Sequence, residues 1–183
     1  KWCKDGECLD GVLVDSLKDY ISKIPANDKT PHLVVLHQMG SHGPAYFKRT
    51  TPEFAPFKPT CDTNAIQGCP RDALINSYDN TIVYTDHILN QVIETLKSEN
   101  QFQTGFWYMS DHGESTGEHG VYLHGAPYAI APSQQTHVPM MMWFSPLWKK
   151  SASAQVQCLS NQRTQELSHD NLFPSLLDRK SVV

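Results

Sequence analysis

The segment GFWYMSDHGE, residues 105–114, is the most informative part of the sequence for predicting the fold. Residues 105–110 form a largely apolar, aromatic-rich run, and Asp111, His112 and Glu114 follow it directly. A short apolar run that ends in polar residues is typical of a buried strand that opens into a loop. The sequence therefore predicts a buried strand over 105–110, with side chains suited to chemistry just beyond its carboxyl end.

Four further elements are predicted around this strand. Residues 9–24 and 71–98 carry apolar side chains every three or four positions, which predicts two amphipathic helices. Residues 32–37 and 138–144 are short apolar runs and predict two more buried strands. Because helices and strands alternate, we expect an α/β fold with a mainly parallel sheet flanked by helices. The proline-containing segment 38–70 should be a long ordered loop.

Length, composition and charge narrow the class of protein. A chain of 183 residues with 39% hydrophobic and 19% charged residues fits one packed domain rather than a disordered segment. The net charge of -4, with no basic stripe, argues against nucleic-acid binding. Its apolar runs are too short to span a bilayer. Since the chain starts at Lys1 without a signal peptide, we expect a processed chain or a fragment whose membrane anchor lies elsewhere.

Four of the five cysteines form close pairs in loop-like sequence. Cys3 lies near Cys8, and Cys61 lies near Cys69. Gaps of four and seven residues suit small disulfide-closed loops better than a zinc ribbon, which prefers two-residue gaps. We therefore favour two disulfides and an oxidising compartment, and expect Cys158 to be a buried or unpaired thiol.

The Asp111-His112 pair offers a carboxylate oxygen and an imidazole nitrogen side by side. Zinc accepts both types of ligand and keeps an open position in hydrolytic or transfer sites. In the alternative interpretation, Asp111 accepts backbone N–H groups in a turn while His112 only stacks. The dipeptide on its own does not decide between these interpretations.

Two other His-Gly pairs, at His42 and His124, strengthen the metal hypothesis. His42 follows the predicted strand 32–37, and His124 lies in the glycine-containing loop after residue 110. Loops at one end of a parallel sheet converge, and a glycine after each histidine allows close backbone approach to a ligand. Any one of these histidines could be a structural residue that donates to a carbonyl. The three together predict a shared pocket.

Six motifs occur in one order along the chain. They are GSHGP (40–44), CDTN (61–64), NSYDNT (76–81), SDHGES (110–115), YLHGAPYA (122–129) and DNLFP (170–174). In this order they closely resemble the catalytic domain of lipid A phosphoethanolamine transferases, including the mobile colistin-resistance type. The resemblance covers residues 2–177 and implies an incomplete alkaline phosphatase/sulfatase-like fold.

The resemblance also implies roles for individual residues. Asp111 and His112 would be two ligands of a catalytic Zn²⁺, and His42 and His124 would face the substrate phosphate, where they would bind a further zinc, hold phosphoryl oxygens or protonate a leaving group. The Cys3–Cys8 and Cys61–Cys69 pairs would be periplasmic disulfides.

For the intact enzyme, the resemblance implies phosphatidylethanolamine as donor, lipid A as acceptor, and polymyxin resistance as the result. Residues 1–183 would be the C-terminal part of one periplasmic catalytic domain at the inner membrane. The family's threonine nucleophile, a glutamate zinc ligand and the membrane segments would lie upstream of Lys1. After residue 177 the sequence departs from the family pattern, so we expect truncation at both ends and no activity from this chain alone.

Two alternatives to lipid A transfer stay open. The first is a related metal-dependent phosphodiesterase, or a transferase acting on another glycan phosphate. The second is an inactive, truncated remnant, because two ligands are too few for a tetrahedral zinc site.

Overall fold

The computed structural model describes residues 1–4 and 6–177. They divide into two compact units: Lys1–Thr95 with His112–Val138, and Leu96–Asp111 with the described part of Pro139–Val183. The predicted departure from the family pattern after residue 177 lies outside the described residues. Within them, no helix is both long enough and apolar enough to cross a bilayer.

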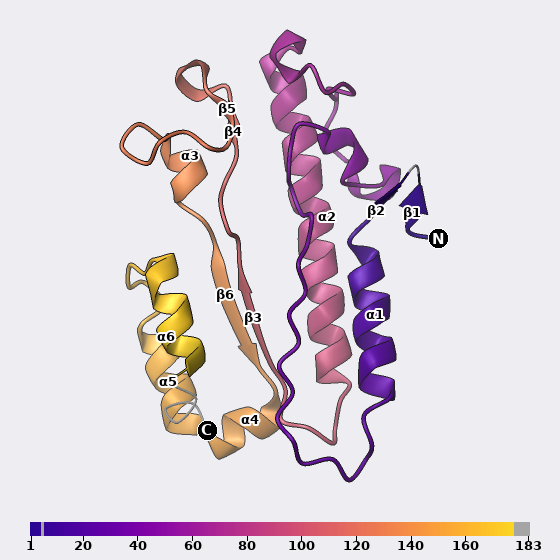
Figure 1. Cartoon of the computed structure of the whole chain (residues 1–183), viewed down its shortest axis with the longest axis vertical. Coiled ribbons are helices and arrows are strands. Elements are labelled where there is room, and N and C mark those ends of the chain that lie inside the picture. Colours follow the sequence, from indigo (N-terminus) through magenta and orange to yellow (C-terminus); the bar gives the residue numbers. More distant parts are fainter. Residues whose placement is uncertain (5, 178–183) are drawn as a thin grey trace. The chain divides into compact units, whose positions relative to one another are not determined.

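Two helices form the frame of the first unit. They are α1 (Gly11–Ser22) and α2 (Arg71–Lys97), whose axes run nearly parallel in Figure 1. Both carry buried apolar residues at helical spacing, such as Val14 and Leu17 on α1. The helices predicted over 9–24 and 71–98 are therefore confirmed.

The long loop 38–70 packs on the first half of α2. It contains three short 3-10 helices: η1 (Tyr46–Lys48), η2 (Pro52–Phe54) and η3 (Ile66–Gly68). Side chains of α2 form hydrogen bonds with the backbone of this loop. The Ser77 hydroxyl accepts from the Cys61 N–H at 2.7 Å, and the Asn80 side chain accepts from the Phe57 N–H and donates to the Phe57 carbonyl. The predicted long ordered loop is confirmed, and its order comes from α2.

Two small antiparallel hairpins complete the first unit. The hairpin of β1 (Cys3–Lys4) and β2 (Glu7–Cys8) precedes α1, and that of β4 (Ser115–Thr116) and β5 (Tyr122–Leu123) encloses η4 (Glu118–Gly120). The short helix α3 (Ser133–Thr136) follows. Both predicted disulfides, Cys3–Cys8 and Cys61–Cys69, are formed.

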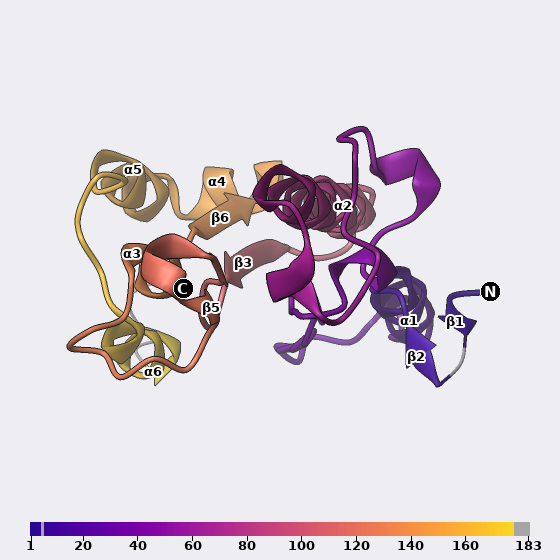
Figure 2. The same ribbon diagram turned by 90° about the horizontal axis from the view of Figure 1, so that it is seen from above.

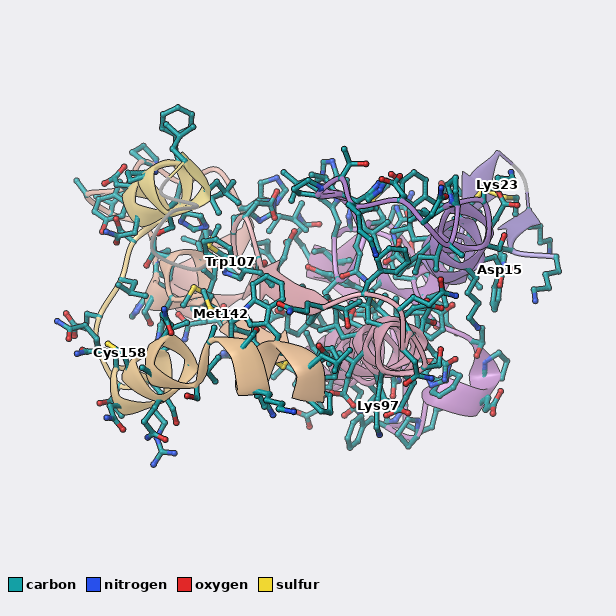
Figure 3. The ribbon with its side chains drawn as sticks, turned by 90° about the horizontal axis from the view of Figure 1, so that it is seen from below. Asp15, Lys23, Lys97, Trp107, Met142 and Cys158 are labelled. Carbon is teal, nitrogen blue, oxygen red and sulfur yellow. A yellow bond between two sulfur atoms is a disulfide. The ribbon has the colours of Figure 1, made fainter. Side chains whose placement is uncertain are left out.

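The second unit is built on one antiparallel strand pair, β3 (Gly105–Met109) and β6 (Met140–Phe144). Trp107 lies opposite Met142 in the register, and Figure 3 labels both. After β6 come α4 (Pro146–Ser151), α5 (Ser153–Asn161), η5 (His169–Asn171) and α6 (Leu172–Leu177). In Figure 2 a long connection separates α5 from α6. Cys158 on α5 is unpaired, as predicted, but exposed rather than buried (Figure 3).

The predicted mainly parallel sheet is wrong for the described residues. All three sheets formed by residues 1–4 and 6–177 are two-stranded and antiparallel. The strands predicted over 105–110 and 138–144 exist, but the one predicted over 32–37 does not. That segment runs without regular structure, and Leu33 and Val35 are 70% and 80% exposed. An apolar run becomes a buried strand only where a neighbour pairs with its backbone, and no described strand does so here.

Candidate metal centre

Three histidines from separate segments of the first unit meet at one point. His42, His112 and His124 each offer one ligand nitrogen, and these nitrogens all lie within 4.8 Å of one another. The His112 and His124 rings stack with their centroids 4.0 Å apart, and the His42 ring lies edge-on to His124 at 5.0 Å. The predicted convergence of the three His-Gly pairs is therefore correct.

The hydrogen bonds of the three rings define their tautomers. The Nδ1 atom of His42 lies 2.6 Å from the Gly43 carbonyl oxygen, and that of His112 lies 3.1 Å from the Gly113 carbonyl. Carbonyl oxygens only accept, so each Nδ1 carries the proton and the neutral ring has its lone pair on Nε2. His124 Nδ1 makes the equivalent bond to a carboxylate oxygen of Glu114 at 2.9 Å.

This donor set fits zinc. Metal-binding histidines usually donate their second ring N–H to a carbonyl or carboxylate, which fixes the tautomer and the ring orientation. All three rings have such a partner. Imidazole nitrogens are also among the preferred ligands of zinc.

Glu114 ties together the segments that carry the histidines. Glu114 is 6% exposed, and besides bonding His124 its carboxylate accepts from the Gly43 N–H at 3.3 Å and from the Tyr46 hydroxyl at 3.1 Å. Burial, and secondly the Glu114 charge, raise the pKa of Tyr46 well above its ordinary value. Tyr46 therefore remains a neutral phenol that donates its proton to Glu114.

The two glycines that follow His42 and His112 are required by close packing. A Cβ atom on Gly113 would lie 1.9 Å from the Gln134 carbonyl oxygen, and one on Gly43 would lie 2.5 Å from the Leu123 side chain. The close neighbour at both glycines is the protein's own chain, so the expected close approach to a ligand stays a prediction. Gly113 N–H also donates to the Gln135 carbonyl at 3.0 Å, which anchors the turn between His112 and Glu114.

The structure brings together three of the four predicted site residues. Asp111 belongs to the second unit, so its place beside His112 in a metal shell stays a prediction. Sequence reasoning missed Glu114 and Tyr46 as site residues. Glu114 is two residues after His112 and Tyr46 is four residues after His42, but this nearness in sequence does not show which groups they bond.

The chain is also similar to known proteins. A family model described as Sulfatase matches residues 1–180. The chain is 49% identical over 182 residues to phosphoethanolamine transferase EptA of Escherichia coli (strain K12), covering 98% of this chain and 32% of the relative. It is 43% identical to phosphatidylethanolamine transferase Mcr-2 of Escherichia coli over 93% of this chain and 30% of the relative.

The chain is similar to solved structures as well. The crystal structure of the soluble domain of lipooligosaccharide phosphoethanolamine transferase A from Neisseria meningitidis matches with a TM-score of 0.90 and 43% identity. The match covers 99% of this chain and 52% of the solved one. The chain thus spans about a third of the length of the curated relatives it matches and about half of this solved domain.

Proposed function

This chain belongs to the sulfatase family, and we propose that the protein containing it transfers phosphoethanolamine from phosphatidylethanolamine to a phosphate group of lipid A. The family's fold is alkaline phosphatase/sulfatase-like. The cluster of His42, His112 and His124 carries the proposal, because its residues lie in motifs that also underlie the resemblance to the transferases. In the reaction, the bond between phosphorus and the diacylglycerol oxygen breaks, and a bond from phosphorus to the acceptor oxygen forms.

We infer that Asp111 and His112 bind Zn²⁺ and that His42 and His124 face the phosphoryl group. When bound, zinc supplies Lewis-acid stabilisation of the negative charge that builds up on phosphoryl oxygens. A site of this kind needs local positive charge, since the chain as a whole carries a net charge of -4.

His42 and His124 supply the proton chemistry in this proposal. In the neutral tautomer, Nε2 of each ring accepts a proton from an attacking group and returns it to a leaving oxygen. Glu114 holds the His124 ring in orientation through its Nδ1–H, and its carboxylate stabilises the ring when Nε2 is protonated. Because Gly43 and Gly113 lack a Cβ atom, the neighbouring segments can pack closely enough for the histidine rings to meet.

Other parts of the machinery are proposed to lie outside residues 1–183. They are a threonine nucleophile, a further acidic ligand, and the membrane segments that would anchor the domain on the periplasmic face of the inner membrane. In the complete domain we expect residues 32–37 to join a mainly parallel sheet. The two disulfides support an oxidising compartment. On this proposal the chain alone is inactive, and the intact enzyme confers polymyxin resistance.

The test is transfer of a labelled headgroup by the intact enzyme. Phosphatidylethanolamine with a labelled ethanolamine headgroup is mixed with lipid A, and labelled lipid A is the expected product. A chelator should abolish transfer, and added Zn²⁺ should restore it. His112→Ala and Asp111→Ala should each reduce transfer at least 100-fold, whereas His137→Ala, which changes an exposed histidine outside the cluster, is the matched control.

Other products would identify the alternatives. Release of free phosphoethanolamine without labelled lipid A would indicate a phosphodiesterase, and label on another glycan would indicate a different acceptor. No metal-dependent product at all would mean that the protein is an inactive remnant.

A further inference from the structure

We propose that Asp10 is a positioning residue for His42, acting through the backbone of residues 39–43; this inference rests on the proposed function. Asp10 is 8% exposed, and both of its carboxylate oxygens accept hydrogen bonds. One accepts the Met39 N–H at 2.9 Å, and the other accepts the Gly40 N–H at 2.8 Å. These two N–H groups lie just ahead of His42 in the chain.

The role of Asp10 departs from what its position in the fold predicts. Asp10 is the N-cap residue of α1, and an aspartate there normally accepts from N–H groups in the first turn of its own helix. Its side chain makes no such bond and instead reaches a segment about thirty residues away. The helix N-terminus remains a favourable environment for the negative charge. The Asp10 side chain therefore does not cap α1 and instead holds the loop that carries His42.

Further hydrogen bonds hold the backbone of the loop that carries His42. His42 N–H donates to the Met39 carbonyl at 3.2 Å, and the His42 carbonyl accepts from Arg49 Nε at 3.3 Å. Gly43 N–H then donates to Glu114. Two buried carboxylates, Asp10 before His42 and Glu114 after it, therefore hold the same short turn from opposite ends.

The chain around Asp10 is closely packed. A Cβ atom on Gly11 would lie 2.6 Å from the Trp2 ring, so Trp2 packs directly over the start of α1. Leu9 N–H donates to the Trp2 carbonyl at 3.0 Å, across the hairpin that the Cys3–Cys8 disulfide closes. Hydrogen bonds to a charged acceptor are about twice as strong as neutral ones, so the Asp10 carboxylate can hold the two successive N–H groups of Met39 and Gly40.

Asp10→Asn is the informative substitution. The amide keeps the size of the side chain, but its NH₂ group would face one of the two backbone N–H donors, so one bond is lost. Because displacement of a catalytic group by about 1 Å costs up to about 100-fold in rate, we expect kcat to fall about 10- to 100-fold with KM for the donor within twofold. Asp19→Asn removes an exposed carboxylate from the same helix and is the matched control, with unchanged kcat.

A double-mutant cycle with His42→Ala separates positioning from general destabilisation. If Asp10 acts through His42, Asp10→Asn should cost less than twofold in kcat when His42 is already alanine. A loss as large in that background as in the wild type would overturn the proposal, and so would a single Asp10→Asn variant with kcat within twofold of wild type.

A second measurement on the intact enzyme does not depend on transfer. The rate of carbethoxylation of His42 by diethyl pyrocarbonate, followed by mass spectrometry, should rise at least threefold in Asp10→Asn and stay unchanged in Asp19→Asn. An unchanged rate at His42 would refute the positioning role. If the wild-type enzyme transfers nothing to lipid A, the proposed function fails, and the modification rate alone still decides the role of Asp10.

Discussion

The Nδ1 atom of His124 donates to the buried carboxylate of Glu114 at 2.9 Å, across ten residues of sequence. The same carboxylate receives the Gly43 N–H and the Tyr46 hydroxyl, so one acidic side chain orients groups from two loops. Glu114 is therefore the structural link between the turn of His42 and the hairpin that ends before His124.

Glu114→Gln is expected to reduce transfer by about 10- to 100-fold, because His124, which moves protons in the proposed reaction, loses the carboxylate that orients its ring. Glutamine keeps the volume but removes the charge that holds His124 Nδ1–H and Tyr46 in place. The measurement is kcat of the intact enzyme with a labelled donor. Glu53→Gln, at an exposed glutamate, should have no effect, and equal losses in both variants would rule out a specific role for Glu114.

Gly113→Ala should be one of the most damaging single-methyl changes in the chain. The new Cβ would lie 1.9 Å from the Gln134 carbonyl oxygen, which forces the turn between His112 and Glu114 to move. We expect loss of zinc from the intact enzyme, measured by elemental analysis, together with a lower melting temperature. At Gly68 the same substitution meets no atom within 4 Å, so Gly68→Ala should retain wild-type zinc content.

Glu118 should make stability depend on acid pH. Burial raises the pKa of Glu118, but the N–H groups of Glu118 and Thr116, the Thr116 hydroxyl and Arg71 outweigh burial and hold the pKa below its ordinary value. A lowered folded-state pKa stabilises the fold above the unfolded value of about 4.3, and the stabilisation disappears as pH falls through the folded value.

Glu118→Gln should therefore lower the free energy of unfolding by about 1 kcal/mol at pH 7 and by much less at pH 3. Urea titrations of both proteins at the two pH values measure the difference. A gap between wild type and variant that is as wide at pH 3 as at pH 7 would contradict the pKa direction.

Replacing Cys61 and Cys69 together by alanine should cost about 2.5 kcal/mol, the loop-closure value for a short cross-linked segment. The pair has a sequence separation of 8, and Cys61 also belongs to the buried cluster of the first unit with Ile66 and Leu74. Thermal unfolding with and without a reductant gives the comparison. Cys158→Ala, at an exposed free thiol, serves as the control and should leave the melting temperature unchanged.

Local patterns in the sequence were sufficient to predict the helices and part of the site. The apolar period in 71–98 predicts α2 because the buried residues of a helix recur on one face. His42, His112 and His124 were found because each precedes a glycine near a predicted strand end. What failed was strand pairing: the run 32–37 has strand-like composition, but its hydrogen-bond partners are set by the tertiary structure.

Asp10, Glu114 and Tyr46 escaped sequence reasoning for a different reason. Their partners are mostly backbone N–H groups or residues distant in the chain, and a backbone donor leaves no mark in the sequence. Asp10 was further concealed because an aspartate before a helix is normally explained by capping. Only the distances in the folded chain show that Asp10 holds the loop instead.

The exposed apolar segment 33–35 should lower the solubility of the polypeptide. Leu33, Val34 and Val35 are exposed in a stretch without regular pairing, and such a stretch can template contacts between separate copies of a chain. We expect the 183-residue polypeptide to precipitate from concentrated solutions through this segment. We also expect it to form inclusion bodies during expression. A lysine in place of Val35 is the simplest change that would keep the material dispersed.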